Sequence, residues 1–157
     1  MNPIANPVFA LLTNPDQLAK LRADRSLVRN AVEETLRYYG LAETTTPRWA
    51  TEEMDLAGLR VERGELVLPV LAVADRDPAR FANPDAFDIE RTDANRRLAF
   101  GKGIHVCLGA PLTRLKGQVA LEALLDRFPS IALAVPTDEI GWQASFLRSL
   151  SELPLKV

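Results

Sequence analysis

FGKGIHVCLG, residues 100–109, is the most informative stretch of this 157-residue sequence. It contains the only cysteine of the chain, Cys107, and the only histidine, His105, together with three of the eight glycines. A helical pattern opens directly after it, at Ala110-Pro111. A single thiol in a glycine-rich loop at the start of a helix has a short list of chemical uses.

The position of Cys107 favours the thiolate form of its side chain. Backbone N–H groups at a helix start lack intrahelical partners, and the positive end of the helix dipole lies there. The N–H groups of Leu108 and Gly109 can donate to the sulfur, and Phe100 can shield it from water. The glycines of the loop permit close approach to a flat ligand.

Several interpretations of this loop are open on its residues alone. A small apolar core thiol is the default for a single cysteine, but the glycines and the helix start argue against it. A nucleophilic Cys107 with His105 as its base is disfavoured, because catalytic Cys and His are normally distant in sequence. A thiolate ligand to haem iron fits, because haem brings four ligands itself. A phosphate loop is weakly indicated, since the glycine spacing matches neither known fingerprint.

The composition is that of an ordinary globular protein. Hydrophobic residues make up 47% and charged residues 25% of the chain, with a net charge of −2. Without a basic block, we expect no binding to nucleic acid or to an anionic membrane surface, and no apolar run is long enough to span a bilayer. Residues 1–12 do not read as a signal peptide, and one cysteine fits a reducing, cytoplasmic setting.

The periodicity of the first 40 residues predicts two helices. One covers residues 15–23 with Asn14 as its N-cap, and the next runs from a Ser26 cap to Tyr39, with Gly40 as the stop signal. Residues 2–12 are interpreted as a flexible terminus in preference to a frayed first helix.

Glu34 and Arg37 stand three residues apart on one face of the second helix. The commoner outcome for such a pair is a solvated ion pair that contributes roughly 0.2–0.5 kcal/mol. The alternative is a buried pair that anchors other backbone, a role to which the planar fork of Arg is suited.

Residues 41–74 read as a small β part. Residues 59–61 and 66–73 are predicted to form a hairpin across Arg63-Gly64, the second piece being a buried strand or a passage into a helix. Residues 75–99 should hold little regular structure, yet some of their apolar side chains must be buried. These side chains are Phe81, Phe87, Ile89 and Leu98.

The last 48 residues predict one long helix and terminal strands. The helix runs from Ala110 to Phe128 and ends at Pro129. The apolar side chains expected to form its buried stripe are Leu112, Leu115, Val119, Ala123 and Leu124. Strands are expected at residues 131–135, 142–147 and 153–157.

Five segments, taken in their order along the chain, resemble one family. They are Glu34-Thr35-Leu36-Arg37, Arg48-Trp49-Ala50-Thr51-Glu52-Glu53, the pair Asp75-Arg76-Asp77-Pro78 and Pro84-Asp85-Ala86-Phe87, and the loop residues Phe100, Gly101, Gly103, His105, Cys107, Leu108 and Gly109. This order is similar to that of the cytochrome P-450 haem-thiolate monooxygenases, and more narrowly to their soluble bacterial branch. The resemblance extends over nearly the whole chain.

The resemblance implies a fold and an activity. The fold would be mainly α with a small β part (α+β), with residues 1–157 forming the C-terminal portion of a single haem-binding monooxygenase domain. The family reaction inserts one oxygen atom from O2 into a small organic substrate. It uses haem b and electrons from a redox partner such as a ferredoxin and ferredoxin reductase.

Individual positions take roles from the resemblance. Cys107 would be the axial iron ligand, Arg48 and His105 would meet the haem propionates, and Glu34 and Arg37 would be structural. Other loop residues would contact the haem, namely Phe100, Gly101, Leu108 and Gly109. Residues that would face the substrate are Thr44, Thr45, Phe146 and Leu147.

The sequence also departs from the family pattern. Ala86 stands where the family often has an Arg that joins the Glu–Arg pair, and Arg97 stands where bacterial members commonly have His. The family's central helix, which supplies the acid and alcohol that relay protons to oxygen, has no counterpart here. No catalytic residue is therefore assigned within the chain.

That departure keeps a second function open. The chain would then be a truncated, non-catalytic haem-binding fragment, or half of an enzyme completed by another chain. In either case the apolar stripes of the Glu-x-x-Arg helix and of the C-terminal helix would lie uncovered. A metal-free interaction module is a third possibility, against which Cys107 and its surrounding glycines argue.

Overall fold

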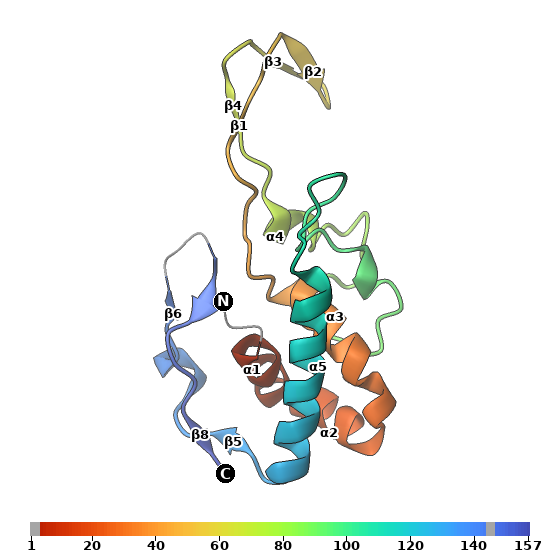
Figure 1. Ribbon diagram of the computed structural model, residues 1–157, viewed down its shortest axis with the longest axis vertical. Coiled ribbons are helices and arrows are strands. Elements are labelled where there is room, and N and C mark those ends of the chain that lie inside the picture. The colour runs from red at the N-terminus through yellow and green to blue at the C-terminus, as the bar shows by residue number, and fades with distance from the viewer. Residues whose placement is uncertain (1–3, 144–146) are drawn as a thin grey trace.

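The computed structural model describes residues 4–143 and 147–157 and is mainly helical. Figure 1 shows a body of packed helices, a thin β arm that rises from one end, and short strands along one side. The four longer helices are α1 (Ala5–Thr13), α2 (Pro15–Ala23), α3 (Val28–Tyr38) and α5 (Ala110–Arg127). Within the described ranges, no helix combines the length and apolar character needed to cross a membrane.

The interpretation of residues 2–12 as a flexible terminus is wrong for the described part. Residues 5–13 form α1, and Val8, Phe9, Ala10 and Leu11 are buried. Pro7 lies in the first turn, where its missing N–H costs no hydrogen bond. The helix is stable because tertiary contacts cover it on several sides, which its short apolar runs did not reveal.

The helices α2 and α3 lie where the periodicity predicted them, but their caps differ. The Asn14 side chain donates to the Ala10 carbonyl at 2.8 Å and so closes α1 instead of capping α2. The Asp24 carboxylate accepts from the Ser26 amide at 2.9 Å and opens the 3₁₀ helix η1 (Arg25–Leu27), which leads into α3. Ser26 therefore receives a cap and does not provide one.

Gly40 ends α3 because the chain passes close to the helix there. A Cβ at Gly40 would lie 2.9 Å from the Leu36 carbonyl oxygen, so any larger residue would force the backbone to shift. The predicted stop signal is confirmed, and its cause is close approach.

The predicted buried stripe of α5 is wrong. Its buried residues are Ala110, Thr113, Gly117, Leu121 and Leu125. Leu112, Leu115 and Val119 are instead 54–57% exposed. Both faces of this helix carry apolar residues, and the smaller side chains of one face allow close packing on α3.

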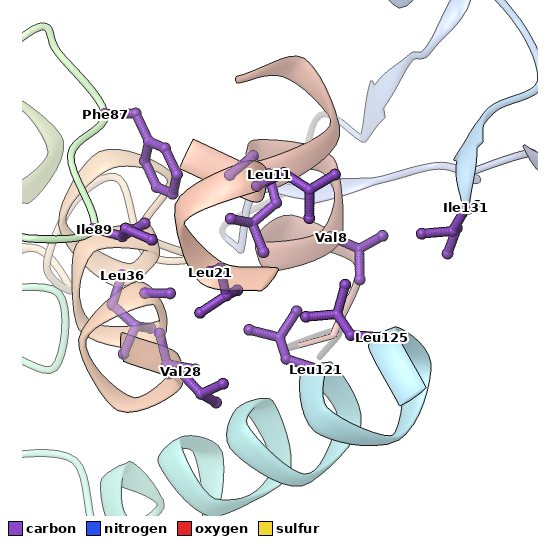
Figure 2. Close-up of a cluster of buried hydrophobic side chains, with 14 of the residues drawn as sticks. Val8, Leu11, Leu21, Val28, Leu36, Phe87, Ile89, Leu121, Leu125 and Ile131 are labelled. Carbon is purple, nitrogen blue, oxygen red and sulfur yellow. The ribbon is translucent and has the colours of Figure 1, made fainter. Parts of the chain in front are cut away.

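One apolar core joins the four longer helices to the coil of residues 75–99. Figure 2 shows side chains from all of them converging. Those labelled are Val8 and Leu11 from α1, Leu21 from α2, Val28 and Leu36 from α3, Phe87 and Ile89 from the coil, Leu121 and Leu125 from α5, and Ile131. Phe81, Phe87 and Ile89 are buried as predicted, whereas Leu98 is half-buried.

The β arm is paired differently from the prediction. The strand β1 (Arg48–Trp49) pairs with β4 (Leu66–Val67), and β2 (Met54–Leu56) pairs with β3 (Leu59–Val61), both antiparallel. The turn at the tip is Ala57-Gly58, where both residues have positive φ. This is the backbone of a tight hairpin turn, which the sequence Ala-Gly does not announce.

Residues 66–73 do pass into a helix, α4 (Leu71–Ala74), as one alternative predicted. They do not form a buried strand, because Leu66, Leu68 and Val70 are all exposed.

The C-terminal strands form two small sheets. The strand β5 (Ala132–Leu133) pairs with β8 (Leu155–Lys156), and β6 (Trp142–Gln143) pairs with β7 (Ser149–Leu150). All three predicted regions contain a strand, and β5 and β8 are shorter than expected, while β7 was not predicted. A 3₁₀ helix, η3 (Thr137–Glu139), connects the sheets, and residues 144–146 lie outside the described part.

Arg37 organises the coil of residues 75–99, in which the 3₁₀ helix η2 (Ala94–Arg96) is the only helix among the described residues. Both Glu34 and Arg37 have 0% side-chain exposure, and Arg37 donates to the Glu34 carboxylate twice at 2.8 Å. The remaining donors reach the carbonyls of Asp75, Pro84 and Ala86 at 2.8–3.0 Å. The solvated alternative for this pair is therefore wrong.

Arg91 is the third member of this buried network, and the sequence analysis missed it. Its Nε donates to Glu34 Oε1 at 3.2 Å, and its Nη atoms donate to the Ala82 and Asn83 carbonyls at 2.7 and 3.0 Å. Arg91 thus supplies the charge that Ala86 cannot. The available signal was the need of a buried carboxylate for a second cation once Ala86 had been noted.

We predict that Arg37→Ala destabilises the fold by about 3–5 kcal/mol, because it leaves a buried carboxylate short of a cation and the Asp75 and Pro84 carbonyls without their arginine donor. Urea unfolding measures this free energy. The exposed pair of Arg60 and Glu53, at 2.8 Å, provides the control: Arg60→Ala should change stability by less than about 1 kcal/mol. Equal losses from the two variants would contradict the anchoring role of Arg37.

Asp75 is a second buried anchor, at the C-terminal end of α4. It is 2% exposed, and its carboxylate accepts from the Leu98 amide at 2.5 Å. Burial raises the pKa of Asp75 to about 6, although the Leu98 amide and the Arg97 and Arg37 guanidinium groups favour the charged form.

This pKa predicts how stability depends on pH. Because the folded-state pKa exceeds the unfolded value of 3.8, the folded chain binds more protons between the two values. The stabilising contribution is complete below about pH 4 and is lost as the pH rises through about 6, by up to roughly 3 kcal/mol. Asp75→Asn should remove this dependence in urea unfolding from pH 4 to 7.5.

Asp126→Asn is the matched control, because this α5 carboxylate is 76% exposed. It should keep the wild-type pH dependence. A difference between Asp75→Asn and wild type that stays constant over the pH range would contradict the prediction.

Candidate functional site

The loop of residues 100–109 is folded by its own backbone. Gly101 and Gly103 have φ of 71° and 85°, a left-handed conformation that strains residues other than glycine. The Gly101 amide donates to the Leu98 carbonyl at 2.7 Å, and the Cys107 amide donates to the Phe100 carbonyl at 3.0 Å. These bonds hold the two ends of the loop together and return the chain to the start of α5.

Cys107 lies on the surface of the molecule, three residues before α5. It is a free, exposed cysteine, and its carbonyl accepts from the Ala110 amide at 3.1 Å. Among the described residues the Leu108 and Gly109 amides donate no hydrogen bond, so both remain available to the sulfur. A Cβ at Gly109 would lie 3.6 Å from Sγ, which places this glycine against the sulfur.

Apolar side chains stand open around the thiol. Ile104 is 95% and Leu108 99% exposed, and Val106 is exposed as well. Leu112, on the first turn of α5, adds to this surface. A thiol surrounded by uncovered apolar side chains suits a large flat apolar ligand, and it excludes the interpretation of Cys107 as a core thiol.

Phe100 is held between two arginines. The guanidinium carbons of Arg97 and Arg114 each lie 5.0 Å from its ring centroid. Both arginines pair with Glu33 of α3, at 2.7 and 2.6 Å. Burial lowers the pKa of Arg97, and the Glu33 carboxylate opposes this effect. The cluster fixes Phe100, and with it the start of the loop, to α3 and α5.

His105 and Arg48 are exposed hydrogen-bond donors that the structure does not bring into contact. His105 lies in the loop itself, and Arg48 lies on β1 opposite Val67. Neither side chain has a hydrogen-bond or ion-pair partner among the described residues. The β arm and the loop lie toward the same end of the long axis of the molecule (Figure 1). Both side chains are therefore free to bind anionic groups.

Residues predicted to face the substrate come together from two regions of the chain. Thr44 bridges to Val70, and Ala42 bridges to Leu147, so the segment of residues 42–45 runs between them. The Thr45 amide donates to the Pro69 carbonyl at 3.0 Å. Phe146 lies outside the described residues.

The donor set fits a haem group. Over residues 4–143 and 147–157, His, Cys, Asp and Glu side chains form no cluster of three that could hold a metal. Haem needs one protein ligand, because the porphyrin supplies four nitrogens. An exposed thiol on an apolar surface, with the unpaired donors of Arg48 and His105 for the propionates, matches those needs.

Comparison with known proteins identifies the family. The model of the Cytochrome P450 family matches residues 14–146. The chain is 50% identical to cytochrome P450 monooxygenase PikC of Streptomyces venezuelae over 157 residues, which cover 99% of this chain and 38% of that protein. It is 45% identical to 6-deoxyerythronolide B hydroxylase of Saccharopolyspora erythraea, with 95% and 37% covered.

Solved structures share the fold. The tirandamycin C-bound P450 monooxygenase TamI superimposes with a TM-score of 0.94 at 44% identity, over 99% of this chain and 39% of that chain. P450BioI in complex with an acyl carrier protein ligated to hexadec-9Z-enoic acid gives a TM-score of 0.92 at 44% identity, over 99% and 40%. The chain thus spans about two fifths of the length of these relatives. By its sequence and its fold, the chain belongs to the cytochrome P450 family.

Proposed function

We propose that residues 1–157 are the C-terminal portion of a haem-thiolate monooxygenase domain, in which Cys107 binds the iron of haem b. The observation that carries this proposal is the exposed Cys107 thiol at the start of α5, within an open apolar surface. Bound haem supplies the oxygen chemistry, by which one atom of O2 enters an organic substrate. The Leu108 and Gly109 amides donate to the sulfur and stabilise its negative charge.

We assign to two side chains the role of orienting the haem. Arg48 and His105 bind the propionates, for which both side chains are exposed and unpaired among the described residues. Charge-assisted hydrogen bonds of this kind are about twice as strong as neutral ones. Gly101 and Phe100 shape the loop that would contact the haem. Gly101 does so by its left-handed backbone, and Phe100 by the packing of its ring between two arginines.

The substrate is assigned as a small organic molecule. TamI is solved with tirandamycin C, and P450BioI with a carrier protein that bears a fatty acid, so relatives of this chain take organic ligands. Thr44, Thr45, Phe146 and Leu147 would face the substrate, three of them in the described segment where Ala42 meets Leu147.

Electrons and location follow from the same proposal. The reaction consumes electrons, and we assign a donor of the ferredoxin and ferredoxin reductase type. The exposed Lys102 in the cysteine loop offers positive charge to such a partner. A cytoplasmic location is supported by the exposed Cys107, since such thiols persist in a reducing compartment.

The decisive experiment is the spectrum of the haem-loaded chain. After reduction and addition of carbon monoxide, the wild type should show the strongly red-shifted Soret band of a thiolate-bound carbonyl haem. Cys107→Ala should lose this band completely because it removes the iron ligand. Ser151→Ala, at an exposed position outside the loop, should keep it. A red-shifted band in Cys107→Ala would overturn the assignment of the ligand.

The propionate contacts are tested separately by haem titration. Arg48→Ala and His105→Ala should each lower haem affinity by roughly 10- to 100-fold, the value of one charge-assisted hydrogen bond. Arg63→Ala removes the same charge from an exposed position on the same β arm and should leave affinity unchanged. If Arg48→Ala and Arg63→Ala behave alike, Arg48 does not bind a propionate.

A second candidate function is favoured by one observation. Leu112, Leu115 and Val119 form an exposed apolar stripe along α5, and the chain spans 38% of its curated relative. The chain would then bind haem without turnover, or would form half of an enzyme that another chain completes. Product formation with a reductase system distinguishes the candidates, because a haem-binding fragment gives the carbonyl band and no product.

A further inference from the structure

The buried Asp75 carboxylate is joined to the cysteine loop by a short series of hydrogen bonds. The Leu98 amide donates to Asp75 Oδ1 at 2.5 Å. The Leu98 carbonyl accepts from Gly101 at 2.7 Å, and the Phe100 carbonyl accepts from Cys107 at 3.0 Å. The carboxylate therefore fixes Leu98, whose carbonyl in turn holds the first turn of the loop through Gly101.

Asp75 is itself held on its other side. Its backbone amide donates to the Leu71 carbonyl at 2.9 Å, and its carbonyl accepts from Arg37 Nη1 at 2.9 Å. Arg37 is in turn locked to Glu34. The backbone of Asp75 is therefore bonded to both α3 and α4, while its carboxylate is bonded to Leu98. In this way Asp75 fixes the position of Leu98 relative to the two helices.

The charged groups around the carboxylate are few. Arg37 faces it from α3, and Arg97 faces it from the segment that precedes the loop. Each of these arginines is paired with its own carboxylate, Arg37 with Glu34 and Arg97 with Glu33. The Leu98 amide is thus the closest donor to the Asp75 carboxylate, at 2.5 Å.

We propose that the Asp75 carboxylate is a positioning residue for the cysteine loop, which it holds through the Leu98 amide and partly releases when it takes up a proton. The proposal rests on the proposed function, because the loop it positions carries Cys107. A hydrogen bond to an ionised acceptor is about twice as strong as one to a neutral acceptor. Since burial raises the pKa of Asp75 to about 6, the release falls in the mildly acidic range.

Protonation of Asp75 is expected to change the stability of the fold and the firmness of the loop in opposite directions. Protonation of Asp75 removes a buried charge, so it stabilises the fold, while it weakens the bond that positions Leu98. Asp75→Asn has nearly the same shape and stays neutral at every pH. It should therefore be more stable than wild type at pH 7.5 and hold the loop less firmly, a combination that a purely structural role does not produce.

The first test needs no haem and uses the full chain followed by NMR from pH 5 to 8. The wild-type Leu98 amide proton should move upfield on acidification with a midpoint near pH 6, whereas in Asp75→Asn it should not titrate there. At pH 7.5 the Cys107 amide should exchange with solvent at least about threefold faster in Asp75→Asn. Asp126→Asn should behave as wild type in both measurements.

The second test measures haem loss from the loaded chain. Between pH 7.5 and 5.5 the wild-type loss rate should rise by about three- to tenfold more than that of Asp75→Asn, and the effects of groups present in both proteins cancel in the comparison. Identical pH profiles would overturn the positioning role, as would a Leu98 amide that does not titrate in wild type. If the chain binds no haem, the proposed function fails, and the amide measurement alone decides whether Asp75 controls the loop.

Discussion

A carboxylate with no access to water, shared between two arginines, holds this structure together. Glu34 alone would be very costly to bury, but Arg37 and Arg91 neutralise its charge. The remaining donors of the two arginines bind the backbone carbonyls of five residues in the coil of residues 75–99. That coil has no sheet partners to satisfy its backbone. The two guanidinium groups perform the task that a hydrogen-bond ladder performs elsewhere, so the coil keeps one conformation.

The cysteine loop inherits its position from this network through two routes. One passes from Arg37 through Asp75 to the Leu98 amide. The other passes from Glu33 through Arg97 and Arg114, which enclose the ring of Phe100. Both routes start on α3, at Arg37 and at Glu33, so one helix controls both the segment before the loop and its first aromatic residue. The ionised form of the buried Asp75 lowers stability at neutral pH, an example of stability lost where a loop is held in one position.

In contrast to this buried network, part of the molecular surface is apolar and exposed, which indicates a surface that binds another molecule. Ile104 and Leu108 stand uncovered beside Cys107, and Leu112, Leu115 and Val119 continue the exposed surface along α5. Soluble chains rarely leave such contiguous apolar area bare. The part around the thiol is the surface that we propose binds haem. The part along α5 is consistent with the length of the relatives, of which this chain spans about two fifths.

The sequence by itself determined the features that depend on neighbouring residues: the glycine-rich loop, the single thiol before α5, and the Glu34-x-x-Arg37 pair on one helix face. It could not determine features that depend on partners far along the chain. Which apolar face of α5 is buried, that α1 is a helix, which strands pair in the arm, and that Arg91 completes the Glu34 network were all decided by tertiary structure. The physical reason is that local conformation follows from short-range sterics and hydrogen bonds, whereas burial and ion pairing are settled only when distant segments compete for the same surface.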